Sequence, residues 1–222
     1  MVSFLRLPYD PPLETTALHA CSKTQPQTDR RDNYLGTGGV SLTALAIARA
    51  TGATTIITSS SDTKLAAARE QYGADHGINY VRTPAWGEEV LRLTGGRGAD
   101  HVIDVGGAGT IAQSLRCVAY GGTVSSIGFL SSVNKEKDKD GGGSGMEIED
   151  LIIQTMTKGV VLRGVMSGSK QQLEEAVRFV AARPALRVPL DRTFAFSRDA
   201  VVEALEYVAA GKQMGKVCIV RE

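Results

Sequence analysis

Residues 32–52 read DNYLGTGGVSLTALAIARATG, and the glycine turn GTGGVS at residues 36–41 decides which fold the sequence predicts. The turn follows the pattern G-x-G-x-x-small and runs directly into a helix that we expect over residues 41–51. Gly36 permits a tight bend, Gly38 lets the backbone approach a bound group, and the small Ser41 lets the helix pack close to a sheet. Since a helix start carries N–H groups without intrahelical partners, the turn predicts an anion site.

Strand and helix signals alternate after the turn. We expect strands over residues 53–59, 76–80, 99–107 and 121–129, separated by helices over residues 62–72, 86–93 and 110–118. A further helix is predicted over residues 149–157, a strand within 158–168 and a helix over 170–182. The tail adds a strand, a helix beginning near Ser197 and a final strand GKVCIV, which does not continue the alternation. This order predicts an α/β fold with a parallel sheet covered by helices.

The segment before the turn does not fit its expected place. A strand that enters such a turn is central in the sheet and is normally a run of Val, Ile and Leu. This chain offers RRDNYL at residues 30–35, and burying Asp32 and Asn33 costs several kcal/mol unless they are paired, roughly 2–7 kcal/mol for each polar group. We therefore expect a frayed first strand of at most residues 34–35, preceded by a disordered arm over residues 1–34.

Composition excludes several classes of protein. With 42% hydrophobic residues, 22% charged residues and a formal net charge of +1, the chain does not resemble a membrane or nucleic-acid specialist. No apolar run reaches the roughly 20 residues of a membrane span, so a cytoplasmic protein is expected. Cys21, Cys117 and Cys218 are odd in number and far apart, which argues against a disulfide framework. Residues 131–146 are charged and glycine-rich and are interpreted as a flexible loop.

Five segments carry a resemblance to a known family: residues 35–70, 72–80, 86–107, 121–129 and 194–220. They resemble the cofactor-binding half of the medium-chain dehydrogenase/reductase family, which contains zinc-type alcohol dehydrogenases and quinone reductases. The resemblance covers residues 35–222 and implies a Rossmann doubly wound parallel sheet of strand order 3-2-1-4-5-6 over residues 35–193. It implies that the catalytic N-terminal barrel domain of the family is missing here, and that residues 194–222 are a remnant of the return to that domain.

The resemblance also implies three groups of cofactor-binding residues. The pyrophosphate of NAD or NADP is expected at the turn, the adenosine side at the end of the 99–107 strand, and the nicotinamide ribose and amide at the end of the 121–129 strand. These groups are Gly36, Gly38, Gly39 and Val40; Val105, Gly106 and Gly107; and Ile127, Gly128 and Phe129. The alternative for the last six is that they are ordinary strand ends.

The choice between NAD and NADP depends on the end of the second strand. An NAD site usually has an acidic residue about 20 residues beyond the turn, but Ser59, Ser60 and Ser61 stand there before Asp62. Three hydroxyls with the Lys64 ammonium suit a 2′-phosphate, which favours NADP. The resemblance adds Tyr80 as a contact of the adenosine phosphate. The alternatives are a solvated Lys64, a Tyr80 that only packs, and Asp62 as the ribose acceptor of NAD.

Hydride transfer also requires a group that polarises the substrate oxygen. In the family this equipment comes mainly from the N-terminal domain, and His19, His76, His101 and the cysteines match none of its zinc-ligand positions. The sequence therefore predicts no zinc site and no catalytic residue in this chain. It predicts a truncated NAD(P)-dependent oxidoreductase acting on a small-molecule alcohol, carbonyl, enone or quinone. The alternatives are a non-catalytic NADP-binding module that pairs, as a homodimer or with a full-length subunit, through residues 159–165, and, less favoured, a methyltransferase.

Overall fold

The computed structural model describes residues 29–128 and 147–221 of the 222-residue chain. The first half contains β1 (Arg31–Leu35), α2 (Gly39–Ala50), β2 (Thr54–Ser59), α3 (Asp62–Tyr72), β3 (His76–Asn79), α4 (Trp86–Leu93), β4 (Ala99–Asp104), the 3-10 turn η1 (Gly107–Gly109), α5 (Ile111–Cys117) and β5 (Val118–Ser126). The second half contains α7 (Ile148–Lys158), β6 (Val161–Gly164), α8 (Lys170–Ala181), β7 (Leu190–Ala195), α9 (Arg198–Ala209) and β8 (Lys216–Val220). The predicted loop 131–146, Phe129, His19 and Cys21 lie outside the described residues.

Six strands form one parallel sheet of order β3-β2-β1-β4-β5-β6, which confirms the predicted Rossmann topology. One face packs against α2 and α3, where Leu42, Leu45 and Leu65 meet Tyr34 and Ile57. The other face packs against α4 and α5 through a second apolar core. The sheet is therefore covered on both sides, as a doubly wound fold requires.

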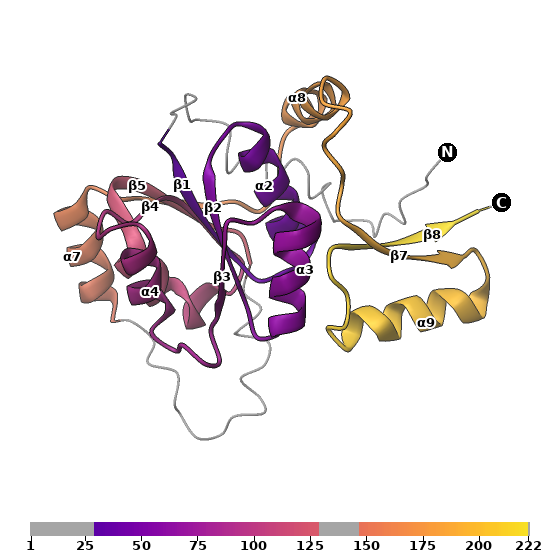
Figure 1. The fold of residues 1–222 in the computed structure, drawn as a ribbon, viewed down its shortest axis with the longest axis horizontal. Helices are drawn as coiled ribbons and strands as arrows, with labels where there is room; N and C mark the ends of the chain where they lie inside the picture. Colours follow the sequence, from indigo (N-terminus) through magenta and orange to yellow (C-terminus); the bar gives the residue numbers. More distant parts are fainter. Residues whose placement is uncertain (1–28, 129–146, 222) are drawn as a thin grey trace.

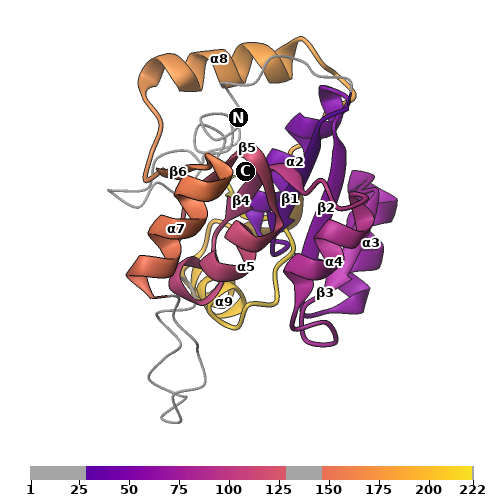
Figure 2. The same cartoon turned by 90° about the vertical axis from the view of Figure 1, so that its left-hand side faces the viewer.

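The tail forms a separate layer. Strands β7 and β8 pair in parallel as a two-stranded sheet, and α9 packs along both. Figure 1 shows this layer beside the six-stranded sheet, reached by the connector that descends from α8. Figure 2 shows α8 lying across one end of the molecule. The strand, helix and strand predicted in the tail are all present. They continue the alternation of strand and helix, contrary to the expectation, but β7 and β8 pair with each other and not with the six-stranded sheet.

The expectation of a first strand limited to residues 34–35 is wrong. Strand β1 runs over five residues between β2 and β4, and Asp32 and Asn33 are completely buried within it. The reason is a partner that the sequence reasoning did not assign. The Nε of Arg30 donates to both oxygens of Asp32 at 2.9 and 2.8 Å, and the Tyr34 hydroxyl donates to the same carboxylate at 2.9 Å. Arg30 itself is only 5% exposed, so the ion pair is enclosed.

The two polar residues of β1 face opposite sides of the sheet. Asp32 points with Tyr34 toward the α2 side, whereas the Nδ2 of Asn33 reaches the buried Cys117 thiol on the α5 side at 4.0 Å. Burial raises the pKa of Cys117 to about 12, so the thiol stays protonated at neutral pH. His101 lies opposite Asp32 in β4, and burial lowers its pKa although the nearby Asp32 acts in the opposite direction. The centre of the sheet therefore carries buried polar groups on both of its faces.

We expect Arg30→Met to lower the free energy of unfolding by about 3–5 kcal/mol, because it leaves the Asp32 carboxylate buried without its cation. Tyr34→Phe removes one hydrogen bond to the same carboxylate and should cost about 1–2 kcal/mol. Urea unfolding at neutral pH measures both. Equal and small losses would show that the ion pair does not hold β1 in place.

Candidate functional site

The glycine turn begins at the carboxyl end of β1 and is fixed by short polar contacts. Gly36 has a φ of +76°, a left-handed conformation that favours glycine, and its N–H donates to the Thr58 hydroxyl at 3.3 Å. The buried Ser41 hydroxyl donates to the carbonyl of Leu35 at 2.5 Å. These contacts tie the first turn of α2 to the ends of β1 and β2, so the helix starts directly above the sheet edge.

The start of α2 is open. Gly38 precedes the helix in an extended conformation, and a Cβ added to it would meet no atom within 4 Å. Within the described part of the chain, no side chain caps this helix start, and its first turn contains no acidic residue. An anion beside Gly38 would therefore gain hydrogen bonds from uncapped N–H groups at the start of α2 and the favourable end of the helix dipole.

The tail brings a lysine onto this turn. Gly215 forms an isolated parallel bridge with Gly38, and its N–H donates to the Thr37 carbonyl at 3.1 Å. The next residue, Lys216, lies across the turn, because a Cβ on Gly39 would stand 2.7 Å from its Cδ and Cε atoms. Sequence reasoning missed Lys216, since it lies 177 positions after Gly39 and only the return of β8 places it there. The adjacent glycine in GKVCIV was the only local signal.

The serine run at the end of β2 is partly used by the helix that follows. Ser59 is buried and its hydroxyl accepts from the Ser61 N–H at 3.3 Å, while the Ser61 hydroxyl caps α3 by accepting from the Lys64 N–H at 3.3 Å. Ser60 is exposed. The Lys64 ammonium donates to the carbonyls of Gly211 and Gln213 at 2.9 and 3.0 Å, so two of its three donors hold the tail.

The carboxylate of Asp62, the alternative ribose acceptor, already has two partners. Its Oδ1 accepts from the amide of Asn79 at 2.7 Å, and its Oδ2 pairs with Arg82 at 2.6 Å. The Tyr80 N–H donates to the Ser59 carbonyl at 3.1 Å, which sets its half-exposed ring beside the serine run. The structure thus gathers the predicted Ser59, Ser61 and Tyr80 in one place. Arg82 is a cation of this group that the sequence reasoning missed.

Asp104 connects the segments that follow β4 and β5, through its buried carboxylate and its backbone carbonyl. Asp104 accepts from four donors: the N–H of Gly106 at 2.9 Å, the N–H of Gly107 at 3.0 Å, and the hydroxyls of Thr110 and Ser114 at 2.6 and 2.7 Å. Its carbonyl accepts from the Ile127 N–H at 2.8 Å. The sequence reasoning did not single out Asp104, although hydroxyl residues six and ten positions later were a signal.

These segments reach the glycine turn. A Cβ on Gly36 would lie 4.0 Å from a methyl group of Val105, and a Cβ on Gly128 would lie 2.4 Å from the Val105 carbonyl oxygen. Only glycine therefore fits at 128 without moving the backbone. The predicted residues at the ends of β1, β4 and β5 are neighbours along one edge of the sheet, which is where open α/β sheets bind ligands.

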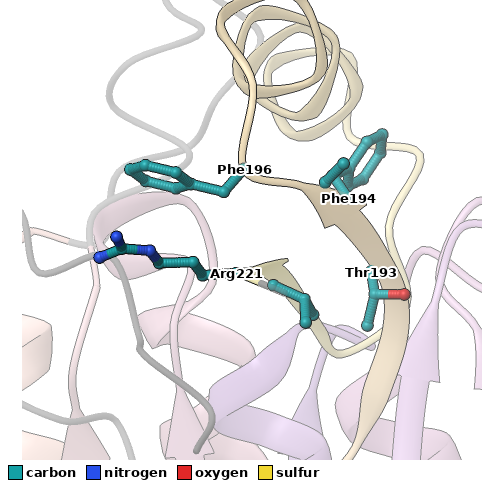
Figure 3. A pocket seen from close by; sticks show the side chains of 6 residues that line it. Thr193, Phe194, Phe196 and Arg221 are labelled. Atoms are coloured by element: carbon teal, nitrogen blue, oxygen red, sulfur yellow. The ribbon is translucent and has the colours of Figure 1, made fainter.

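A separate hollow of about 550 Å³ lies away from this edge, at the ends of β7 and β8. Figure 3 shows Thr193 and Phe194 on β7 and Phe196 just beyond its end, with Arg221 at the end of the paired strand β8 extending to the same side as Phe196. The hollow is open to solvent and its lining is partly polar and partly apolar. The residues that line it include no pair of groups suited to acid–base chemistry.

Within residues 29–128 and 147–221, no three His, Cys, Asp or Glu side chains converge as metal ligands. The described residues therefore do not fit a zinc ion. His76 begins β3 and His101 lies inside the sheet. Among the same residues, no helix is long and apolar enough to span a bilayer.

Comparison with known proteins gives consistent matches. The family model for zinc-binding dehydrogenases matches residues 39–182. A zinc-type alcohol dehydrogenase-like protein of Schizosaccharomyces pombe is 39% identical over 185 residues, which is 83% of this chain and 50% of that protein. An NADP-dependent isopropanol dehydrogenase of Clostridium beijerinckii is 33% identical over 136 residues, 57% of this chain and 38% of that protein.

A crystal structure of an NAD-dependent alcohol dehydrogenase superposes with a TM-score of 0.75 at 27% identity, covering 93% of this chain and 56% of the other. The chain spans about half the length of the curated relatives it matches.

We expect Asp104→Leu to lower the free energy of unfolding by at least about 3 kcal/mol, because four enclosed donors lose their acceptor. Asp104→Asn keeps an oxygen for the Gly106 and Gly107 amides and should cost about 1–2 kcal/mol. Urea unfolding measures the difference, and amide hydrogen exchange at Gly106 and Gly107 reports on the turn itself. An asparagine variant as unstable as the leucine variant would contradict this role.

Proposed function

The chain belongs to the zinc-binding dehydrogenase family, and on that premise we propose that it binds a nicotinamide dinucleotide along the carboxyl edge of its six-stranded sheet. The observation that carries the proposal is the open start of α2, where Gly38 faces free space and the described residues provide no side-chain cap. The diphosphate bridge of the cofactor is the anion that suits this position. Gly36, Gly39 and Val40 shape the same turn.

Lys216 adds a full positive charge to this arrangement. Its side chain already lies across Gly39, and a lysine beside a helix start can form a charge-assisted hydrogen bond with a phosphate oxygen. The adenosine half then lies along Val105, Gly106 and Gly107, and the nicotinamide half along Ile127 and Gly128. Phe129 remains a predicted contact outside the described residues.

For the choice of cofactor we propose NADP, with NAD as the alternative. Support comes from the residues that follow β2, where Lys64 stands in the first turn of α3 after Ser59–Ser61 and Arg82 pairs with Asp62. The one carboxylate of this group, Asp62, is paired with Arg82 and bonded to Asn79, so it is poorly placed to accept a ribose hydroxyl. The similar isopropanol dehydrogenase of C. beijerinckii carries NADP in its name.

The proposed activity is hydride transfer between NADP(H) and a small alcohol, carbonyl, enone or quinone. When bound, the cofactor would supply the hydride for reduction of a carbonyl, enone or quinone and accept it from an alcohol. The chain's own residues would hold the diphosphate at the start of α2, and Asp104 fixes the turn after β4 and joins it to the end of β5, where the rest of the cofactor would lie. The alternative is an NADP-binding module without turnover, favoured by the lack of a metal-ligand set in the described residues. Binding of NADPH without oxidation by a panel of aldehydes and quinones would select the alternative.

We also propose that a second copy pairs along the β6 edge. This strand ends the sheet, and its Val161 and the nearby Ile148 and Met156 of α7 are largely exposed. Sedimentation velocity of the chain would detect the dimer. A cytoplasmic location and the division of domains at residues 34 and 193 stay predictions.

We expect Gly38→Ala to weaken NADPH binding at least about tenfold, roughly 1.4 kcal/mol, because the methyl group enters the space of the diphosphate. Folding should be unaffected, since Gly38 has a φ of −79°, which alanine adopts, and no neighbouring atom within 4 Å. Fluorescence titration measures the affinity, and thermal melting checks the fold. Lys216→Gln should also weaken binding, whereas Lys212→Gln, on the exposed tail loop, is the matched control. Unchanged affinity in Gly38→Ala would contradict the proposed site.

We expect the chain to bind NADP at least about tenfold more tightly than NAD, and Lys64→Gln to remove most of this preference. The physical reason is that the lysine charge acts on the 2′-phosphate, which NAD lacks. Parallel titrations with both cofactors measure the ratio, and Arg69→Gln in the same helix is the control. A preference for NAD of about tenfold would overturn the assignment.

A further inference from the structure

A second hollow, of about 500 Å³, lies where the carboxyl ends of α2 and α3 meet the connector between α8 and β7. Its lining includes Arg49 from α2, Arg183 and Arg187 from the connector, and Tyr72 and Gln71 from α3. Alanines and Leu186 make up the apolar remainder. We call it the arginine pocket. The connector can be followed in Figure 1, running from α8 past α2 and α3 to β7.

The arginine pocket is remote from the proposed cofactor site. The glycine turn is at the first residue of α2, Gly39, and Arg49 is ten residues further along the helix. At about 1.5 Å per residue, the two ends are roughly 15 Å apart. An occupant of the arginine pocket would therefore not share its protein contacts with the cofactor diphosphate.

The pocket is rich in positive charge. Arg49 has one carboxylate partner, Asp75, at 3.4 Å, and both side chains are about 40% exposed. The Arg183 guanidinium stacks over the Phe179 ring at 3.7 Å and donates to the Phe179 carbonyl at 3.1 Å, so it is held in a fixed orientation. Arg187 is exposed on the same connector. Three arginines thus line one hollow, and Asp75 pairs with Arg49 alone among them. A second carboxylate, Asp191, lies close enough for its charge to act on the Tyr72 hydroxyl.

The remaining groups of the pocket are compatible with an anion. Two of the last carbonyls of α2 already have donors, because Ala48 accepts from the Thr51 and Ala53 N–H groups and Arg49 accepts from the Gly52 N–H. Burial, and secondarily the charge of Asp191, raises the pKa of Tyr72, so its hydroxyl remains a donor. The Gln71 amide is a further donor.

We propose that the arginine pocket binds a small multivalent oxyanion, such as a phosphate ester or a polycarboxylate. Planar guanidinium groups bind carboxylate and phosphate oxygens through paired hydrogen bonds, and three of them around one space can serve two anionic groups of one molecule. The apolar floor of alanines and Leu186 then contacts the carbon skeleton. This proposal is independent of the cofactor site.

The test is calorimetric titration of the whole chain with citrate and, separately, with fructose 1,6-bisphosphate, at constant ionic strength. We expect at least one of them to bind, and the double variant Arg183→Gln/Arg187→Gln to bind it at least about tenfold more weakly, since two charge-assisted contacts are lost. Arg178→Gln, an exposed arginine of α8 outside the pocket, is the matched control and should bind as the parent does.

Preference for one of the two probes identifies the anionic group that the pocket accepts. Equal binding by the parent and the double variant would overturn the proposal, and so would the absence of binding by either probe at millimolar concentration. Thermal melting of each variant without probe separates a lost site from a lost fold. An unchanged affinity for NADPH in the double variant would show that the two sites are distinct.

Discussion

The buried ion pair between Arg30 and Asp32 is the contact on which the rest of the structure depends. It lets a polar strand occupy the centre of a parallel sheet, where an unpaired carboxylate would cost several kcal/mol. The position of β1 sets the position of the glycine turn, which begins at the next residue. Through Ser41 and Gly36, the same strand end fixes the start of α2. A change in β1 would therefore propagate directly to the candidate site.

The site is assembled from the ends of several strands and from a distant tail. Asp104 is buried and connects several segments. Its carboxylate accepts from four donors of the following turn and helix, and its carbonyl accepts from the Ile127 N–H just after β5. The tail contributes twice, because Lys216 crosses the glycine turn and the Gly211 and Gln213 carbonyls hold Lys64. The two-stranded β7–β8 layer is thus connected to the proposed diphosphate site by direct contacts, so this tail takes part in shaping the site.

Helix α2 links the two regions for which we propose an anionic ligand. Its start presents N–H groups and open space to the proposed cofactor, and its end contributes Arg49 to the arginine pocket. Both regions suit oxyanions, but for different reasons: backbone amides and a helix dipole at one end, and arginines from α2 and the α8–β7 connector at the other. The separation allows each to be altered without touching the other.

The local sequence pattern was sufficient to predict much of this protein's secondary structure and sheet. The order of helices and strands, the Ser61 and Gly73 caps of α3 and the parallel sheet follow from hydrophobic period and capping residues, which act over a few positions of the chain. The glycine turn was recognised for the same reason, and family resemblance gave the strand order. Only the tertiary structure decided that Asp32 is buried together with its near neighbour Arg30. It also decided the contacts between groups that are far apart in the sequence: Lys216 over Gly39, Asp62 with Arg82, and the three arginines that line one hollow. These depend on how strands return in space, because a side chain's charge is fixed by its sequence but its partner is fixed by the fold.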